Sequence, residues 1–365
     1  MEKDFFNSGD RFRGFIIERL LGRGGIGLVY LVRHEMLDTL YALKILDPEV
    51  ATASPTYVKR FLREAKLAAR IRHPNLVTVH ECGFDQARGL YFLVMDYVPG
   101  GDLRNAIAFS GKFTPEAAAR IVAQVASAMQ AAQAYNVVHR DIKPENIIIQ
   151  DDGTVKLVDL GIAKAENIGD SLRTTTENVF GTPTYVSPEQ AMSAADVDER
   201  ADIYSLGIVF FEMVTGKTPY QGKNPAQMLA QIMCDDATPD PRDFDPSVPA
   251  PFAVLIRRMT MKDRDRRLAS FARVLEELAK LGCDMGLASQ VNVELTPTKL
   301  PDADEGLGID IEKLPERNDT LSFDTDDPQV KEFVAKLKLR RLLRKAGYVV
   351  ALVAAALAIL AIMLW

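Results

Sequence analysis

The stretch that decides the fold is VHRDIKPENII, residues 138–148. Within six residues it holds a potential general base at Asp141, a cation at Lys143 and a side-chain amide at Asn146. Apolar residues on both sides attach this polar loop to a hydrophobic core. The stretch therefore predicts a catalytic loop that the core holds in place.

A glycine-rich segment lies near the start of the chain, in FIIERLLGRGGIGLVYLV, residues 15–32. Strand-like apolar residues flank the glycines, which let a backbone turn close over phosphates and present N–H groups to them. The plainer interpretation is a tight turn that binds nothing. A dinucleotide-binding motif would continue as a helix after its third glycine, whereas residues 28–32, LVYLV, favour a strand. The pattern therefore argues against a dinucleotide site.

A lysine stands inside an apolar strand pattern at YALKIL, residues 41–46. Taken alone, Lys44 would be an ordinary surface position of an alternating strand. The segment RFLREAKLAA, residues 60–69, is rich in helix formers and can bring Glu64 to this lysine. A lysine that contacts an anionic nucleotide needs a carboxylate to hold its direction. The two residues together therefore favour a nucleotide-binding role.

Composition sets limits on the whole chain. With 365 residues, 47% of them hydrophobic, the chain is expected to form one large domain with appendages. A net charge of −6 argues against a general nucleic-acid-binding surface. The three cysteines are widely spaced and form neither a zinc-site pattern nor a disulfide framework. They suit a reducing cytoplasm.

The end of the chain has a different character. Residues 347–365, GYVVALVAAALAILAIMLW, form an uncharged stretch of 19 residues. As a helix it would span roughly 30 Å, the thickness of a bilayer core. The alternative is a buried helix of the globular domain. Because basic residues precede the stretch, we expect a single transmembrane helix with everything before it in the cytoplasm.

Two segments separate this helix from the globular part. Residues 284–328 are rich in Asp, Glu, Thr and Pro and poor in aromatic residues, which predicts an acidic disordered linker. The basic juxtamembrane segment, residues 330–345, has apolar residues at helical spacing. It is either an amphipathic helix on an anionic lipid surface or a positively charged flank of the membrane helix, and both interpretations stay open.

Five motifs in order along the chain resemble those of the protein kinases, in particular the bacterial Hanks-type Ser/Thr kinases. They are G-x-G-x-x-G-x-V, A-x-K, H-R-D-x-K-P-x-N, D-x-G and x-P-E. The resemblance covers about residues 11–282 and implies an α+β fold of two lobes with ATP between them. The lobe at about 11–95 would be small, antiparallel and β-rich with one main helix, and the lobe at about 102–282 larger and helical. Leu160 and Ser187 replace the usual Phe and Ala of two motifs without removing a catalytic group.

The resemblance also implies catalytic roles. Asp141 would orient the substrate hydroxyl and accept its proton, while Lys143 stabilises the transferring γ-phosphoryl group. Lys44 would contact the α- and β-phosphates and be held by Glu64. Two residues would hold Mg²⁺, with Mn²⁺ as an alternative: Asn146 and Asp159.

The nucleotide site implied by the resemblance has three parts. Apolar walls from Val29, Ala42 and Ile148 would enclose the adenine. Met95 would be the gatekeeper, and the backbones of Asp96 and Val98 would offer hinge hydrogen bonds. The hairpin over the phosphates would consist of Gly22, Arg23, Gly24, Gly25, Ile26, Gly27, Leu28 and Val29.

Regulatory and architectural roles follow from the same resemblance. Arg140 would pair with a phosphothreonine, and Thr174 and Thr176 resemble autophosphorylation sites, although an ordinary polar loop is the plainer interpretation. Four residues are expected to support the fold: Thr182 between Asp141 and Lys143, Glu189 paired with Arg267, and Asp202 against the catalytic-loop backbone. The tripeptides Lys-Pro-Glu at 143–145 and Gly-Thr-Pro at 181–183 resemble those of the kinases that phosphorylate serine and threonine.

Two other classes compete with an active protein kinase. A pseudokinase scaffold normally lacks the lysine, the base or the metal-binding aspartate, and all three are present here. A small-molecule kinase would lack the peptide-docking segment at 181–189, which is intact. The expected partners are therefore ATP, proteins with Ser or Thr, a lipid bilayer at the C-terminal helix and a second copy for trans-autophosphorylation, with no nucleic acid.

Overall fold

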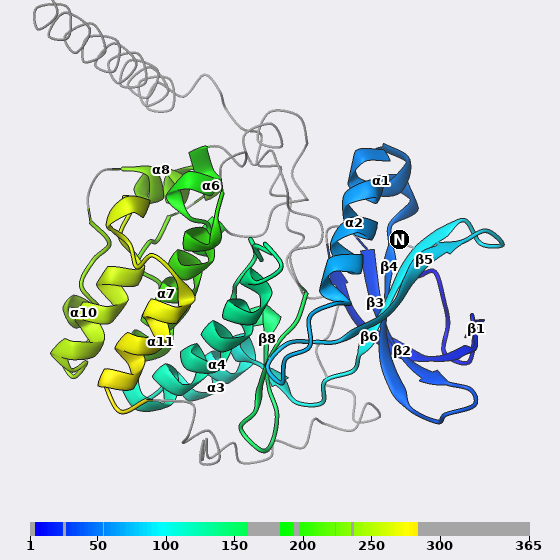
Figure 1. Cartoon of the computed structure of the whole chain (residues 1–365), viewed down its shortest axis with the longest axis horizontal. Coiled ribbons are helices and arrows are strands. Elements are labelled where there is room, and N and C mark those ends of the chain that lie inside the picture. The colour runs from blue at the N-terminus through cyan, green and yellow to red at the C-terminus, as the bar shows by residue number, and fades with distance from the viewer. Residues whose placement is uncertain are drawn as a thin grey trace, which may run out of the picture. The chain divides into compact units, whose positions relative to one another are not determined.

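The computed structural model describes residues 4–24, 27–53, 55–159, 183–192, 197–222, 224–234 and 237–283. Figure 1 shows these residues as two lobes, one built on a sheet and one built of helices. The bilobal arrangement expected from the resemblance is confirmed. Several predictions lie outside the described residues: the positions Gly25, Ile26, Leu160, Thr174, Thr176 and Thr182, and the segments 284–328, 330–345 and 347–365.

The N-terminal lobe contains a six-stranded antiparallel sheet with the strand order β1-β2-β3-β4-β6-β5. The central strands β4 and β6 are rich in apolar and aromatic residues and are buried on both faces of the sheet. The strands are β1 (Arg11–Phe12), β2 (Phe15–Gly24), β3 (Gly27–His34), β4 (Leu40–Leu46), β5 (Val79–Asp85) and β6 (Leu90–Asp96).

Two helices, α1 (Pro48–Ala53) and α2 (Pro55–Ala68), connect β4 to β5. The longer one, α2, buries Phe61, Ala65 and Ala68 to within 1% exposure. These residues recur at the spacing of one helical face, so this face of α2 is its packing surface. The helix α2 contacts β5 and contains Glu64. A helix at this position in the small lobe was predicted from the sequence.

The second lobe is organised around α7 (Glu199–Thr215), in which every residue from Ala201 to Thr215 is buried. A helix that is buried all round is the centre of a domain. The carboxylate of Asp198 caps its N-terminus, and Gly216, at a φ of 69°, ends it. The surrounding helices are α3 (Leu103–Ser110), α4 (Pro115–Gln133), α6 (Pro188–Met192), α8 (Pro225–Met233), α9 (Pro241–Phe244), α10 (Ala250–Met259) and α11 (Phe271–Lys280).

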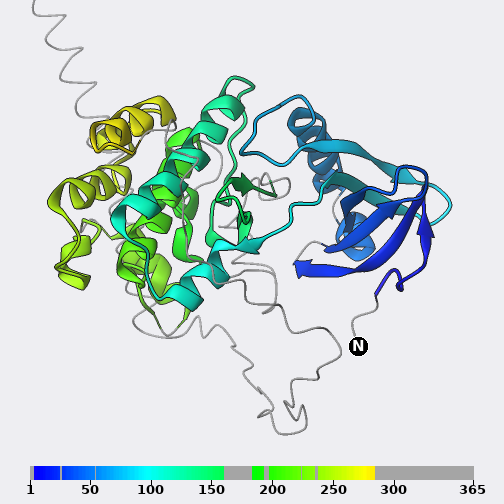
Figure 2. The ribbon, with the colours of Figure 1, turned by 90° about the horizontal axis from the view of Figure 1, so that it is seen from below.

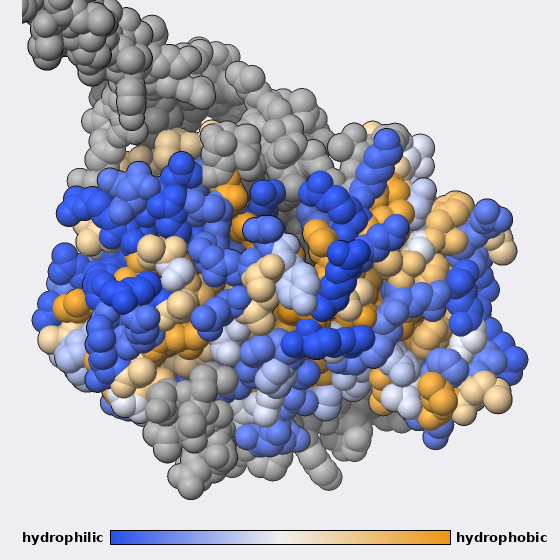
Figure 3. Space-filling view, in the orientation of Figure 1, coloured by the Kyte–Doolittle hydropathy of each residue, from blue (hydrophilic) through white to orange (hydrophobic). Residues whose placement is uncertain are grey.

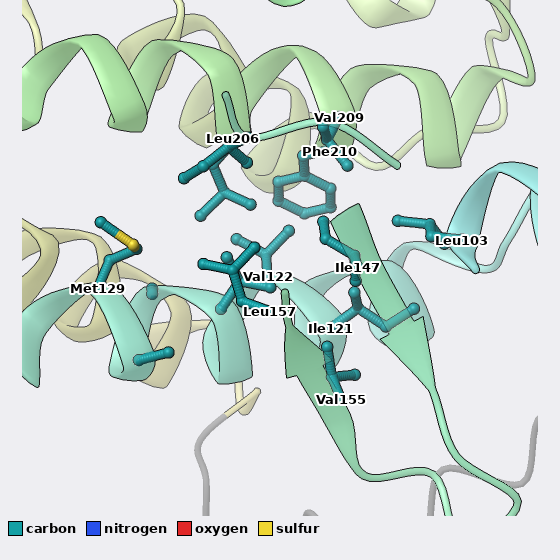
Figure 4. Close-up of a cluster of buried hydrophobic side chains, with 14 of the residues drawn as sticks. Leu103, Ile121, Val122, Met129, Ile147, Val155, Leu157, Leu206, Val209 and Phe210 are labelled. Atoms are coloured by element: carbon teal, nitrogen blue, oxygen red, sulfur yellow. The ribbon is translucent and has the colours of Figure 1, made fainter. Parts of the chain in front are cut away.

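A small sheet of β7 (Gly101–Asp102), β8 (Ile147–Ile149) and β9 (Val155–Leu157) lies at the edge of the helical lobe that faces the other lobe. In Figure 4 the side chains of β8 and β9 point into the space between α4 and α7. The core there is continuous and apolar, and it includes Leu103, Ile121, Val122, Met129, Ile147, Val155, Leu157, Leu206, Val209 and Phe210. The predicted catalytic loop therefore ends in strands that the core fixes.

The lobes meet where the chain returns from α2. Leu76 forms a parallel bridge with Leu157 of β9, and the side chain of Asn75 donates to Val155 O at 2.8 Å. Figure 2 shows the strands of one lobe and the helices of the other joined in this region. On the described part of the face in Figure 3, hydrophilic side chains predominate and apolar ones are scattered between them.

The packed structure begins before the boundary predicted at residue 11. Phe6 is 3% exposed and belongs to the same cluster as Phe12 and Tyr30 on the outer face of the sheet.

In the part of the chain that the structure describes, no helix has the length and apolar character needed to cross a membrane.

Candidate active site

The predicted catalytic loop forms one hydrogen-bonded unit around Asp141. The Asn146 amide donates from Nδ2 to the Asp141 carbonyl at 2.8 Å and to its Oδ2 at 3.1 Å. Lys143 Nζ lies 3.2 Å from the same Oδ2. The predicted cation and the predicted amide thus both contact the predicted base. Pro144–Asn146 make the short 3₁₀ helix η1, which turns the chain into β8.

A buried carboxylate shapes the loop from below. Asp202 of α7 is fully buried and accepts hydrogen bonds from the backbone N–H groups of His139 and Arg140, both at 2.7 Å. Arg140 has a φ of 63°, a left-handed conformation that costs energy for a residue with a side chain. Its carbonyl accepts from the Gln190 side chain at 3.0 Å. These bonds hold the strained backbone, and the support predicted for Asp202 is present.

Burial also changes the acidity of Asp202. Loss of solvent disfavours its charged form more than the two backbone N–H groups favour it, and this raises the pKa of Asp202 to about 7. The group beneath the catalytic loop therefore titrates near neutral pH.

Lys44 and Asp159 form an ion pair across the two lobes. The Lys44 side chain, on β4, is 6% exposed, and Asp159 follows β9 with a φ of 59°. Burial alone would raise the pKa of Asp159, but the charge and hydrogen bond of Lys44 outweigh it, so the pKa lies below its usual range. Asp159 is therefore a carboxylate at neutral pH, with its backbone in a left-handed conformation.

The partner predicted for Lys44 is Glu64, and the ion pair that the structure describes for Lys44 is with Asp159. Glu64 of α2 lines a small cavity of about 110 Å³ together with Arg140. Burial, followed by the charges of Glu64 and Asp159, raises the pKa of the Tyr57 phenol. Glu64 thus lies near Arg140 of the catalytic loop and near Tyr57, and its predicted role at Lys44 stays a prediction.

The predicted metal ligands are brought together by a backbone bond. Val158 N donates to Asn146 O at 2.9 Å, which places Asp159 beside the end of η1. Because the Asn146 Nδ2 donates to Asp141, its Oδ1 is the atom that it offers to a cation. Within the described residues there is no cluster of three or more His, Cys, Asp or Glu suited to a metal. A carboxylate and an amide oxygen fit Mg²⁺, which takes few protein ligands and completes its shell with phosphates and water.

The glycine hairpin is formed by β2 and β3, with Gly24 opposite Gly27. Gly27 has a φ of 154°, and a Cβ atom there would lie 2.0 Å from Ile45 O of β4. Only glycine allows this approach. The hairpin is therefore packed against the strand that carries Lys44.

The predicted adenine walls lie on neighbouring strands. Ala42 of β4 pairs with Met95 of β6, and both are buried, while Val29 and Ile148 are partly buried on β3 and β8. Asp96 uses its backbone N–H to donate to Thr78 O at 2.9 Å. Because this N–H is already bonded, the carbonyl oxygen of Asp96 is the backbone group that would make the predicted hinge hydrogen bond. Val98, the second hinge position, is partly buried against the core.

The pair predicted between Glu189 and Arg267 is present. Arg267 Nη1 lies 2.6 Å from Glu189 Oε1, and its Nη2 donates to Oε2 at 3.1 Å. The Arg267 side chain is fully buried and also donates from Nε to Met261 O at 2.9 Å. This bidentate pair joins α6 to the segment before α11.

Sequence reasoning missed one group beside the site. Arg104 of α3 donates to Glu145 of η1 at 3.0 Å and to Glu212 of α7 at 2.6 Å, and it also bonds the Tyr185 hydroxyl. Tyr185 in turn donates to Glu212 at 2.5 Å. The partners lie between 41 and 108 residues from Arg104, so no local pattern could reveal them. The network ties the catalytic loop to the segment before α6.

Comparisons with known proteins agree with this geometry. Residues 15–278 match the family model described as the protein kinase domain. The chain is 38% identical over 256 residues to the serine/threonine-protein kinase PrkC of Bacillus subtilis, covering 70% of this chain and 38% of that protein. It is 34% identical over 290 residues to the probable serine/threonine-protein kinase PknB of Corynebacterium glutamicum, covering 77% and 44%.

A solved structure covers the same region. The crystal structure of the PknI kinase domain of Mycobacterium tuberculosis superposes with a TM-score of 0.60 at 28% identity, covering 75% of this chain and 99% of that one. The chain spans about two fifths of the length of the curated relatives it matches. The similarity is thus confined to one domain of longer proteins.

Proposed function

The chain belongs to the protein kinase family, and from this we propose that it transfers the γ-phosphoryl group of ATP to serine and threonine hydroxyls of proteins. The observation that carries the proposal is the unit of Asp141, Lys143 and Asn146, facing the Lys44–Asp159 pair. Relatives whose names specify serine/threonine-protein kinases support the choice of hydroxyl.

The chain's own residues divide the work. Asp141 accepts the proton of the substrate hydroxyl, and its hydrogen bond from Asn146 directs the carboxylate. Lys143, 3.2 Å from that carboxylate, lies where it stabilises the charge of the transferring group. When Lys44 binds the α- and β-phosphates, its ion pair with Asp159 would break or would persist beside the phosphate contacts.

The nucleotide and its metal fit between these groups. Asn146 and Asp159 would hold Mg²⁺, with Mn²⁺ as an alternative, and the ion supplies charge neutralisation at the phosphate oxygens. The glycine hairpin would cover the phosphates with backbone N–H groups, and Ala42 and Met95, paired on β4 and β6, would border the adenine. Catalysis of phosphoryl transfer depends mainly on positioning the reactants and on stabilising charge. The residues named here would supply both effects.

Regulation and location form a second layer of the proposal. Phosphorylation of Thr174 and Thr176 by another copy of the chain would give Arg140 a phosphate to bind. The segment 347–365 would anchor the protein in a membrane with the kinase domain on the cytoplasmic side. Confinement to a surface raises the local concentration of copies and would favour trans-phosphorylation. Flotation of the full chain and of a variant without 347–365 on vesicles tests the anchor, since only the full chain should float.

The activity itself is tested by incorporation of labelled γ-phosphate from ATP and magnesium into a generic basic protein. We expect label on serine and threonine with the full chain, and a rate about 10²- to 10⁴-fold lower with Asp141→Asn. Asp151→Asn is the matched control, because this exposed aspartate lies in the turn between β8 and β9. An absence of label in the full chain, despite a folded protein that binds ATP, would favour a scaffold.

A further inference from the structure

The first described residues form a strap on the outer face of the sheet, here called the N-terminal strap, Asp4–Asp10. Its anchor is Phe6, which is 3% exposed. The Phe6 ring lies 5.2 Å from that of Phe12 and 5.5 Å, edge-on, from that of Tyr30. Phe5 N donates to the Tyr30 hydroxyl at 3.1 Å. The strap is therefore held to β3 by apolar burial and a hydrogen bond.

Backbone hydrogen bonds attach the same strap to β2, and a cation contact attaches it to the turn between β5 and β6. Gly9 N donates to Ile17 O and Ile17 N donates to Asp10 O, both at 2.8 Å. The Arg88 guanidinium lies 5.0 Å from the centre of the Phe6 ring. With three kinds of contact, the strap is part of the folded lobe and its first residue has a defined position.

That first residue reaches the glycine hairpin. The Asp4 carboxylate forms an ion pair with the Arg23 guanidinium, and Arg23 stands between Gly22 and Gly24. On the other side of the hairpin, Gly27 packs directly against Ile45 O. The β3 side of the hairpin is thus held by sterics, and the β2 side is held by the charge of Asp4.

We propose that Asp4 is a positioning residue for the nucleotide-binding hairpin and acts through Arg23. The ion pair restrains the β2 side of the hairpin, so that its backbone N–H groups stay over the phosphates. This inference rests on the proposed function of the hairpin. Because Asp4 and Arg23 are 45% and 38% exposed, the tether is an electrostatic contact that salt weakens.

The test compares Asp4→Asn with Asp38→Asn in the full chain. Asp38 pairs with Arg33 at 2.9 Å on the same sheet, at the end of β3 away from the hairpin, so this variant loses a similar surface pair. For Asp4→Asn we expect KM for ATP to rise about two- to fivefold with kcat unchanged. Asp38→Asn should change neither, and Asp4→Glu should restore the normal KM. At 1 M salt the difference in KM between the wild type and Asp4→Asn should disappear, because screening removes the pair.

A second measurement does not need activity. Hydrogen exchange of the amides in residues 22–28, without nucleotide, should be faster in Asp4→Asn than in the wild type or Asp38→Asn. If the wild type neither binds nor uses ATP, the proposed function fails while exchange still decides whether the tether exists. If the wild type is active and Asp4→Asn matches it in KM and in exchange, the inference is overturned.

Discussion

The catalytic loop and the glycine hairpin belong to different lobes and are held in different ways. Asp202, which holds the loop backbone, and the side chain of Arg267, which holds α6 through Glu189, are fully buried and make short bonds to backbone and carboxylate. The hairpin is held by strand pairing, by the approach of Gly27 to Ile45 and by an exposed ion pair at Arg23. Buried bonds fix one arrangement, whereas exposed ones allow the hairpin to move about it.

This difference suits the tasks of the two regions. The loop must present its base in one geometry, since misplacement of about 1 Å costs roughly 100-fold in rate. The hairpin must admit and release a nucleotide in each cycle, which requires an element of lower stability. Changes under the loop should therefore affect folding and activity together, and changes at the hairpin should mainly affect nucleotide affinity.

The largest expected effect is on the buried pair that joins α6 to the segment before α11. Arg267→Ala leaves Glu189, whose side chain is 12% exposed, without its bidentate partner. We expect the free energy of unfolding to fall by about 3–5 kcal/mol, with activity lost in parallel. Urea denaturation of the full chain measures this.

The matched control for that variant is Arg242→Ala. Arg242 pairs with Asp240 at 2.9 Å, but its side chain is 44% exposed. Its loss should change stability by less than about 1 kcal/mol. Equal effects of the two variants would remove the distinction between buried and exposed pairs.

The next effect concerns the pH dependence of Asp202. Burial raises its pKa to about 7 from 3.8, so the folded protein holds a proton there that the unfolded chain has released. The stabilisation is full below pH about 4 and is lost as the pH rises to about 7. The wild type should therefore exceed Asp202→Asn in stability by about 1–4 kcal/mol more at pH 4 than at pH 8.

Asp202→Asn should also disturb the loop, because an amide offers one oxygen to two backbone N–H groups. Kinase activity of this variant should be low at every pH. A stability difference that does not vary with pH would mean that Asp202 is ionised with an ordinary pKa, and that the loop is supported by a buried charge.

A smaller effect is expected at the hairpin. In Gly27→Ala the new Cβ atom meets Ile45 O, so β3 and β4 must separate locally. We expect a loss of about 1–3 kcal/mol in stability and weaker ATP binding. Gly101→Ala is the control, since a Cβ atom there has nothing within 4 Å. Unchanged ATP affinity in Gly27→Ala would contradict the role assigned to this approach.

The sequence predicted those parts of the site that are linked by short, ordered motifs. Asp141, Lys143 and Asn146 lie within six residues, so their grouping follows from local chain geometry. The Glu189–Arg267 pair and the bonds of Asp202 followed from the resemblance. The two lobes were predicted for the same reason.

What the sequence could not supply depends on distant contacts or on conformation. The Arg104 network joins residues up to 108 positions apart and has no periodic signal. The pairing of Lys44 with Asp159 joins residues 115 positions apart in the sequence, so no local pattern could specify it. The strap at Asp4–Asp10 was missed because Phe5 and Phe6 are too short an apolar stretch to predict an element.

The smallest effect is expected at the hinge. His80 Nε2 lies 2.6 Å from Asp96 Oδ1, and the two side chains are 37% and 33% exposed. Burial would raise the pKa of Asp96, but hydrogen bonds from His80 and Thr78 lower it below 3.8. The stabilisation from these hydrogen bonds is therefore present above pH about 4. It is lost as the pH falls through the lower pKa of Asp96 in the folded protein.

His80→Gln should lower stability by less than about 1 kcal/mol, because water screens a pair that is one third exposed. KM for ATP should change less than about twofold, since the Asp96 N–H keeps its bond to Thr78 O. Thermal unfolding at pH 7 and steady-state kinetics measure both. If His80→Gln instead lowered nucleotide affinity tenfold, the hinge would need one fixed geometry, as the catalytic loop does. Of the nucleotide-binding elements, only the hairpin would then tolerate movement.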